Sequence, residues 1–374
     1  MWKKANSDGG ASLKNRDKVS TKYVGMDVHQ QTVSVVVLDE SGTELQVSTM
    51  PMRRDVIVEF FSGLKGKLQV TFEEGTHAGW LYDQLEPIVD RVVVCNPRKN
   101  ALLKSGSKSD LIDARKLANL LRGKMLSPVY HGQNSFRTLK ELSRTYAAIN
   151  KDLTRVMCRI KAIYRSRAIS TQGKSLYSKR RRQQWLELVS EQQGVKQRTE
   201  FFYQQFDALR AIRLQIRKKL VEESRKAEAA ERLASIPFMG PIRVAILLGK
   251  VETPSRFRTK RQFWTYCGLG LETRSSADYV EINGQVQRSK KAVFIRGLNF
   301  NHSAELKEIF KGAATTSSIR DGVFKQYYEG LLGKGIRASM ARLTLARKIA
   351  AISLVIWKKG ERFDPKQVLN IQAV

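Results

Sequence analysis

The chain has 374 residues, of which 42% are hydrophobic, so its length allows two or three domains and its composition excludes a globally disordered protein. Its 67 Lys and Arg against 35 Asp and Glu give a formal net charge of +32, which is too large for an ordinary metabolic enzyme and indicates a polyanionic partner, most commonly nucleic acid. The sequence has no apolar run of membrane-span length, no signal-peptide core at its start and no CxxC pair, so we expect no membrane partner, no disulfide framework and a cytoplasmic location.

The first third of the chain alternates short strands with helices. After a polar tail at residues 1–20, which we expect to be disordered, β-branched runs predict strands at Lys22–Val28, Thr32–Leu38, Glu44–Ser48, Leu68–Phe72 and Arg91–Cys95. Helical periodicity predicts helices at Asp55–Leu64, His77–Ile88 and Asp110–Arg122. This order favours an α/β sheet of ribonuclease-H type, although the periodicity also fits other mixed sheets.

The middle of the chain is basic and helical in character. Phe136–Arg167 and Lys196–Ala234 are rich in Arg, Lys and Gln and predict long helices, with breaks around Ser170–Ser178 and near Gly194. Apolar residues of the second helix recur every three or four positions, at Phe202, Phe206, Leu209, Ile212, Ile216 and Leu220. Such a stripe either packs within the chain or forms a helical dimer arm.

The last part of the chain is predicted to be rich in α-helix. Ser235–Pro241 contains a Gly turn between two helical segments, which is the pattern of a helix-hairpin-helix-like element whose turn amides can face a DNA phosphate. A plain helical hairpin has the same pattern. A basic helix, Ile336–Lys359, follows and is closed by Gly360.

Charge is distributed unevenly over these segments. Residues 1–130 have 19 basic and 15 acidic side chains, residues 131–230 have 23 and 9, and residues 231–374 have 25 and 11. The first third therefore keeps its carboxylates while the rest is strongly basic. A nucleic-acid enzyme combines basic modules that hold phosphate with an acidic site that holds metal ions.

Four acidic residues of the first third are candidate metal ligands. Asp27 ends the first strand, Glu73 ends the strand Leu68–Phe72, and Asp110 and Asp113 lie three residues apart on one helix face. Taken alone, the helical pair has a simpler explanation, with Asp110 as the N-cap and Asp113 complementing the helix dipole. With Asp27 and Glu73, the four carboxylates can converge on Mg²⁺, and two such ions ~4 Å apart can drive phosphoryl transfer.

Several neighbouring residues remain open. Glu74 is the alternative to Glu73, because strand alternation directs only one of the two side chains inward. His29 and His77 either line the site or are merely polar neighbours of the acids. Ser275 and Ser276 follow a Gly-rich apolar segment that is typical of a loop, and a serine hydroxyl is a weak nucleophile unless it is activated.

Motifs in both halves of the chain resemble the DEDD-type transposases of bacterial insertion sequences, a family that includes the Piv-type invertases and the bridge-RNA-guided recombinases. The segment KSDLIDA at Lys108–Ala114 resembles the family's K-[TS]-D-x-x-D-A signature, and GMDVH at Gly25–His29 precedes it. In the second half, IPFMGP at Ile236–Pro241 and YCGL at Tyr266–Leu269 resemble the family's "IPGVGP" and "YxGL" segments.

The resemblance implies a domain order and a site. Residues 21–130 would form a RuvC-like domain with Asp27, Glu73, Asp110 and Asp113 as Mg²⁺ ligands, residues 131–232 a basic helical or coiled-coil region, and residues 233–374 a C-terminal transposase domain. That last domain would supply a serine nucleophile, which falls on Ser276 with Ser275 as the fallback.

The resemblance also implies partners. The chain would cut and rejoin donor and target double-stranded DNA as a dimer or tetramer, guided by a noncoding bridge RNA. It would be a cytoplasmic, nucleoid-associated protein of a bacterium. The alternative with related chemistry is a RuvC-like junction nuclease that forms no covalent intermediate. A third possibility is a non-catalytic nucleic-acid-binding protein derived from a transposase, against which the complete set of four acids argues.

Overall fold

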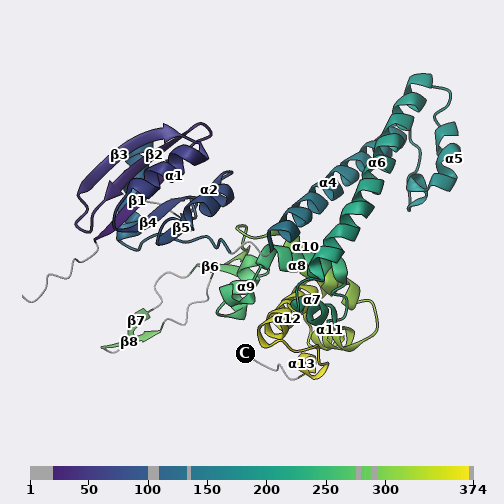
Figure 1. Ribbon diagram of the computed structural model, residues 1–374. Helices are drawn as coiled ribbons and strands as arrows, with labels where there is room; N and C mark the ends of the chain where they lie inside the picture. Colours follow the sequence, from purple (N-terminus) through teal and green to yellow (C-terminus); the bar gives the residue numbers. More distant parts are fainter. Residues whose placement is uncertain are drawn as a thin grey trace, which may run out of the picture. The chain divides into compact units, whose positions relative to one another are not determined.

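The computed structural model describes residues 20–99, 109–132, 136–274, 279–282, 284–288 and 294–369. The chain forms two compact units, Met1–Gly132 and Gln133–Val374 (Figure 1). None of the helices in the described ranges is long and apolar enough to cross a membrane. Cys95 and Cys267 are buried and Cys158 is exposed, and none of the three forms a disulfide.

The first unit is built on a mixed five-stranded sheet. Its strands are β1 (Thr21–Val28), β2 (Thr32–Leu38), β3 (Glu44–Pro51), β4 (Lys67–Glu73) and β5 (Arg91–Cys95). They lie in the order β3-β2-β1-β4-β5. The pairs β3–β2 and β2–β1 are antiparallel, whereas β1–β4 and β4–β5 are parallel. The predicted α/β sheet is therefore confirmed as a mixed sheet.

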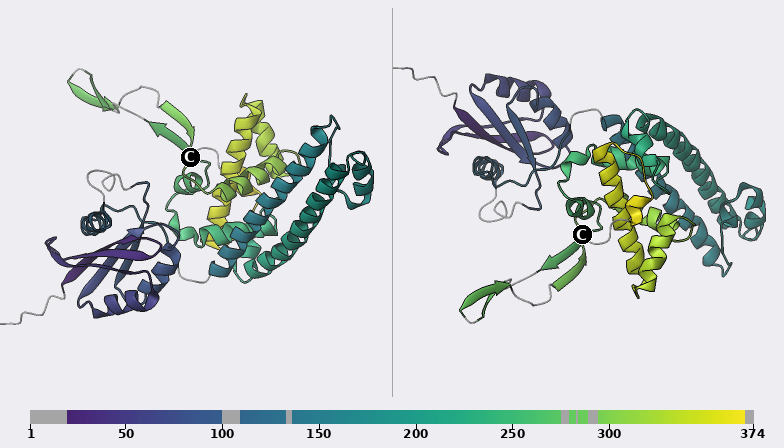
Figure 2. Two further views of the ribbon diagram at one scale, coloured as in Figure 1. Left: turned by 90° about the horizontal axis from the view of Figure 1, so that it is seen from above. Right: turned by 90° about the horizontal axis from the view of Figure 1, so that it is seen from below.

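Alternation along the strands gives this sheet two buried faces. Val24 and Met26 of β1 pack with the helices α1 (Arg54–Gly63) and α2 (Ala78–Leu85). Tyr23 of β1 and Val36 and Leu38 of β2 pack instead with α3 (Asp110–Arg122). Figure 2 shows α3 on one face of the sheet and α1 and α2 on the other. The sheet is thus covered on both sides, which explains the nearly continuous apolar run of β2.

The second unit begins with two long helices, α4 (Arg137–Arg165) and α6 (Gln193–Ser224), which pack along each other. The short helix α5 (Arg182–Glu187) and the 3-10 turns η3 (Ser175–Tyr177) and η4 (Lys179–Arg181) connect them. Their outer ends share a separate apolar cluster (called here the arm cluster): Leu153, Val156, Ile160, Tyr164, Leu176, Leu186, Val189, Tyr203 and Phe206. Packing within the chain thus accounts for much of the apolar stripe of α6, although Ile212 remains 41% exposed.

The prediction of one continuous helix over Lys196–Ala234 is wrong. The chain turns after Ser224 and a separate helix, α7 (Ala229–Ala234), follows. Leu220 and Leu233 are both fully buried in the same cluster. In an unbroken helix, thirteen residues would turn these two side chains about 140° apart, so the break allows both to face one core.

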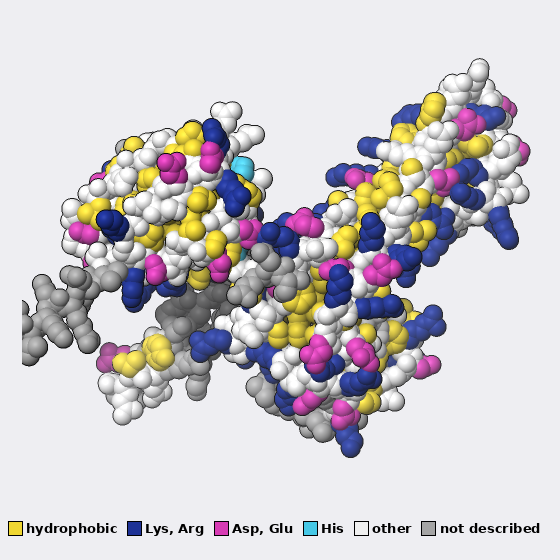
Figure 3. Space-filling model, viewed as in Figure 1, with side chains coloured by type: hydrophobic (Ala, Val, Ile, Leu, Met, Phe, Trp, Pro, Cys, Tyr) yellow, Lys and Arg dark blue, Asp and Glu magenta, His cyan; other side chains and the backbone are white. Residues whose placement is uncertain are grey.

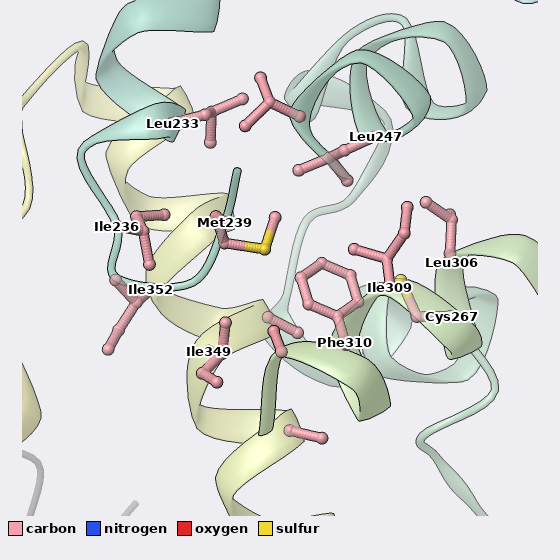
Figure 4. Packing of buried hydrophobic residues seen from close by; sticks show 14 of the residues in the cluster. Leu233, Ile236, Met239, Leu247, Cys267, Leu306, Ile309, Phe310, Ile349 and Ile352 are labelled. Atoms are coloured by element: carbon pink, nitrogen blue, oxygen red, sulfur yellow. The ribbon is translucent and has the colours of Figure 1, made fainter. Parts of the chain in front are cut away.

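The remaining helices enclose the largest apolar core. They are α8 (Pro241–Val251), η5 (Pro254–Arg256), α9 (Lys260–Tyr266), α10 (Ala304–Ser317), α11 (Val323–Gly333), α12 (Ala338–Lys359) and α13 (Lys366–Leu369). Figure 4 shows residues of α7, α8, α10 and α12 meeting in this core. A turn through Gly240 separates α7 from α8. α12 ends at Gly360 with φ 69°, as the sequence indicated.

Four short strands in the second unit were not predicted. β6 (Leu271–Arg274) pairs with β9 (Phe294–Leu298), and β7 (Tyr279–Ile282) pairs with β8 (Gln285–Arg288), both antiparallel. Each has four or five residues. Tyr279 is 65% exposed and Val286 73% exposed. Strands of this length leave little alternation of hydrophobic and polar residues to detect.

Candidate functional site

A close contact between a strand and a helix positions the acidic residues of the first unit. A Cβ atom on Gly25 of β1 would lie 2.0 Å from the carbonyl oxygen of Ala114 and 2.4 Å from the amide nitrogen of Ala118. Only glycine therefore allows α3 to lie so close to β1. Asp27 follows Gly25 by two residues on the same strand face, and Asp110 precedes Ala114 by one helical turn. The contact at Gly25 thus brings these two carboxylates together.

His29 joins the two carboxylates. Its Nε2 lies 3.2 Å from Oδ2 of Asp27 and 3.3 Å from Oδ1 of Asp110. One ligand atom from each of the three residues lies within 4.8 Å of the other two. The sequence placed His29 beside the acids without deciding its role, and the structure makes it a member of the cluster. Its position two residues after Asp27, in the turn from β1 to β2, was the available signal.

The charge of this cluster is not fully compensated. Partial burial raises the pKa of Asp27 above its usual value, His29 opposes this, and the negative charges of Asp110 and Asp113 raise it further. The carboxylate form of Asp27 is therefore electrostatically disfavoured, and a cation beside it would relieve the repulsion. Carboxylate oxygens are ligands that suit Mg²⁺, so the donor set fits a hard divalent cation.

Strand register places Glu73 next to this cluster in the sheet. In the parallel pair β1–β4, Gly25 lies opposite Thr71 and Met26 opposite Phe72, so Asp27 and Glu73 are the next positions along the two strands. Phe72 belongs to the face covered by α1 and α2. By alternation Glu73 belongs to the opposite face, where α3 lies.

Glu74 has a different environment from Glu73. Its backbone N–H donates to the carbonyl oxygen of Cys95 at 2.9 Å, and its carboxylate contacts Nε2 of His131 at 2.6 Å. The His131 ring stacks on Tyr82 with 5.1 Å between centroids. Glu74 is thus engaged by a residue that follows β5 and α3 in the chain.

The N-terminus of α3 shows that Asp110 is not its cap. Ser109 is the N-cap, and its hydroxyl accepts a hydrogen bond from the amide of Ile112 at 3.3 Å. Asp110 is the first residue of the helix, so the interpretation of Asp110 as an N-cap is wrong. Asp113 lies one turn further and contacts Nζ of Lys116 at 3.5 Å. The group of three within 4.8 Å does not include Glu73 or Asp113.

The serine candidates cannot be placed in the same way. Ser275 and Ser276 lie outside the described residues. The segment before them is described: α9 ends at Tyr266, a turn with φ 66° at Gly268 follows, and β6 leads to Arg274.

Comparisons with known proteins give matches in both parts of the chain. A family model described as "Transposase" matches residues 24–166, and another described as "Transposase IS116/IS110/IS902 family" matches residues 230–329. A curated protein of Sinorhizobium fredii (strain NBRC 101917 / NGR234), y4pF/y4sB, which is named as a transposase, is 28% identical over 145 residues. The match covers 39% of this chain and 35% of that protein, so the chain spans about a third of the relative's length.

The two family models together cover well over half of the chain, and the matched residues lie in both of its units. The chain therefore belongs to the IS116/IS110/IS902 family of transposases.

Proposed function

We propose that this chain is an insertion-sequence transposase that cuts and rejoins DNA, using divalent metal ions held by Asp27, Glu73, Asp110 and Asp113. The observation that carries the proposal is the approach of Asp27 and Asp110 on β1 and α3, with His29 between them. The register of Glu73 beside Asp27 supports a wider acidic site. A bound Mg²⁺ would neutralise phosphate charge and acidify a nucleophile there.

The residues of the cluster have separable roles in this proposal. Asp27 and Asp110 bind and fix the cation from two elements whose distance is set at Gly25. His29 contacts the same two carboxylates and keeps them oriented toward each other. Asp113 adds negative charge, which already acts on Asp27.

The strand-cleavage step is assigned to Ser276. Its Oγ forms a bond to phosphorus while the bond from phosphorus to the leaving nucleoside oxygen breaks. The serine proton passes to a general base, and the leaving oxygen takes up a proton. The covalent phosphoserine keeps the energy of the phosphodiester, so rejoining needs no nucleotide cofactor.

Nucleic-acid partners are assigned to the basic part of the chain. Residues 131–230 carry 23 basic and 9 acidic side chains. Figure 3 shows Lys and Arg spread along the helices α4 and α6. A surface of this kind holds phosphate backbones by charge and shape rather than by base sequence. The proposal includes donor and target DNA, a noncoding guide RNA and assembly of several copies.

The test is cleavage of labelled element DNA in Mg²⁺, followed on a denaturing gel. Asp110→Asn should lower cleavage at least ~100-fold, because it removes a charged ligand while keeping the shape of the side chain. Glu59→Gln, on the exposed surface of α1, is the matched control and should cleave like the wild type. Near-normal cleavage by Asp110→Asn would disprove the acidic site.

The same gel tests the serine. The wild type should form a covalent protein–DNA adduct that Ser276→Ala cannot form. An adduct that persists in Ser276→Ala and vanishes in Ser275→Ala would move the nucleophile by one residue. Cleavage without any adduct in the wild type would instead indicate a hydrolytic nuclease.

A further inference from the structure

The second unit contains a basic cavity that the proposed chemistry does not use. It has a volume of about 710 Å³ and lies between α9 and α12, with Tyr327 of α11 in its wall. Six cationic side chains line it: Arg258, Lys260, Arg347, Lys348, Lys358 and Lys359. No Asp or Glu is among the described residues that line it, although Lys359 contacts Glu361 outside it at 3.8 Å.

Lys348 is the least expected member of this lining. It is only 7% exposed, and its Nζ has no hydrogen-bond partner within the described part of the chain. Burial, together with the nearby charge of Lys260, lowers the pKa of Lys348 to about 8. A buried ammonium without a partner is unfavourable unless an anion or an acceptor compensates for it.

A second uncompensated donor lies beside it. Nη2 of Arg347 is buried without a hydrogen-bond partner in the described structure, while Nε of the same side chain donates to the carbonyl oxygen of Leu269 at 2.7 Å. This bond fixes the guanidinium. Two adjacent residues that line the cavity therefore carry buried N–H groups without a partner among the described residues, and such donors suit a phosphate.

Aromatic rings complete the wall. Trp264 is held by a hydrogen bond from its Nε1 to the carbonyl oxygen of Arg347 at 2.9 Å. Nζ of Lys348 lies 5.3 Å from the ring centroid of Tyr327, and Nζ of Lys260 lies 5.8 Å from that of Trp264. Aromatic side chains beside cations form the usual stacking surface for an unpaired base.

We propose that this cavity receives one unpaired nucleotide of a bound nucleic-acid strand, with its phosphate at Lys348 and Arg347 and its base against Trp264 or Tyr327. The volume falls within the range of about 300–1,000 Å³ that is typical of small-ligand sites. The cationic lining selects an anion, and the aromatic and aliphatic lining selects a flat apolar group attached to it. The inference rests on the proposed nucleic-acid function but involves neither the acids of the first unit nor the serine.

The experiment measures binding of the full chain to fluorescein-labelled 12-mers by anisotropy. The probes are single-stranded DNA, single-stranded RNA, an abasic DNA strand and a blunt DNA duplex. Lys348→Met keeps the unbranched shape and most of the length of the side chain and removes its charge. Lys334→Met removes the same charge from an exposed position at the end of α11, outside the cavity, and is the matched control.

Lys348→Met should weaken binding of a single strand about tenfold, whereas Lys334→Met should weaken it no more than about twofold. On the duplex and the abasic strand, the two variants should differ little. The strand type that loses more affinity, DNA or RNA, identifies the source of the nucleotide. Equal losses for the two variants on single strands, or equal losses on single and abasic strands, would overturn the proposal.

A second variant removes the dependence on one buried position. Lys260→Met changes a half-buried residue at the rim and should reproduce the loss on single strands if Lys348→Met does not fold by circular dichroism. Failure of the cavity proposal can be distinguished from failure of the proposed function. A wild type that does not cleave but binds strands through Lys348 would contradict the transposase chemistry alone, and one that cleaves with unaltered strand binding in these variants would contradict the cavity alone.

Discussion

Glu73 and Glu74 are neighbours in the sequence with different surroundings in the fold. Glu74 is engaged by His131, whereas Glu73 ends β4 in register with Asp27. Glu73→Gln should therefore lower DNA cleavage at least ~100-fold, whereas Glu74→Gln should keep at least about a tenth of it. The measurement is DNA cleavage by the two variants in Mg²⁺, compared under conditions in which both bind the DNA equally well. The reverse ranking would make Glu74 the ligand and Glu73 its neighbour.

The burial of Lys348 should also affect how the free energy of unfolding depends on pH. The pKa of Lys348 in the folded chain is about 8, below the usual value of 10.5, because the side chain is buried. The unfolded chain therefore binds more protons between about pH 8 and 10.5, and the free energy of unfolding rises with pH across this window. At pH 7 both states are protonated and the folded state has the full cost of the buried charge.

Lys348→Met should accordingly be more stable than the wild type at pH 7, by about 1–3 kcal/mol, and the difference should shrink toward pH 9.5. The other titratable groups that line the cavity with Lys348 are Arg258, Lys260, Tyr327, Arg347, Lys358 and Lys359. They are the same in both proteins, and burial raises the pKa of Tyr327 above its usual value, so that it stays neutral. Urea unfolding at the two pH values is the measurement. A difference that is independent of pH would show that Lys348 is not buried as a cation.

The sequence was informative about single residues where strand ends and helix starts are well marked. Asp27 and Asp110 could be paired because each begins or ends an element. The position of the His29 ring could not be predicted, because it depends on side-chain rotation in a turn. The burial of Lys348 was also hidden, since it results from α9, α11 and α12 packing around one residue of a basic helix.

At the scale of elements, the contact of β1 with α3 is the most sensitive feature of the first unit. Gly25→Ala would place a methyl group 2.0 Å from the backbone of α3, so the helix must shift. We expect a loss of about 3 kcal/mol in the free energy of unfolding of this unit. Cleavage should fall as well, because Asp110 moves with α3.

Gly79→Ala is the matched control for this substitution. Gly79 lies in α2, and a Cβ there meets no atom within 4 Å. The control should be neutral or more stable by up to about 1 kcal/mol. Thermal unfolding of both variants gives the comparison. An equally stable Gly25→Ala would mean that α3 can move away from the sheet without cost.

Strands and helices were predictable from the sequence where burial gives them a clear hydrophobic pattern. The five strands of the first unit were found to within a few residues because they alternate or are wholly apolar, and β3 extends past Ser48 because Met50 is buried. The break between α6 and α7 was missed because no Pro or Gly marks it. It follows from the need to bury both Leu220 and Leu233 in one core, which local sequence does not reveal.

At the scale of the whole molecule, charge is the dominant property. The net charge of +32 is concentrated after residue 130, and in the second unit it extends along α4 and α6 (Figure 3). Each phosphate that this surface neutralises should lower the slope of log affinity against log salt by about 0.9 for duplex DNA. The wild type should therefore show a slope of several units.

Two double variants test whether helix α6 contributes to this slope. Arg217 and Lys219 are exposed on α6, and Lys65 and Lys67 are exposed in the first unit, where charge is nearly balanced. The double variant Arg217→Gln/Lys219→Gln should reduce the slope by about one to two units, equally for DNA of any sequence. Lys65→Gln/Lys67→Gln removes the same charge and should reduce it by less than half as much. Filter binding of DNA and RNA from 50 to 300 mM salt gives the slope for each double variant. Equal reductions of the slope would mean that affinity depends only on the total charge of the chain and that α6 is not a contact surface for phosphate.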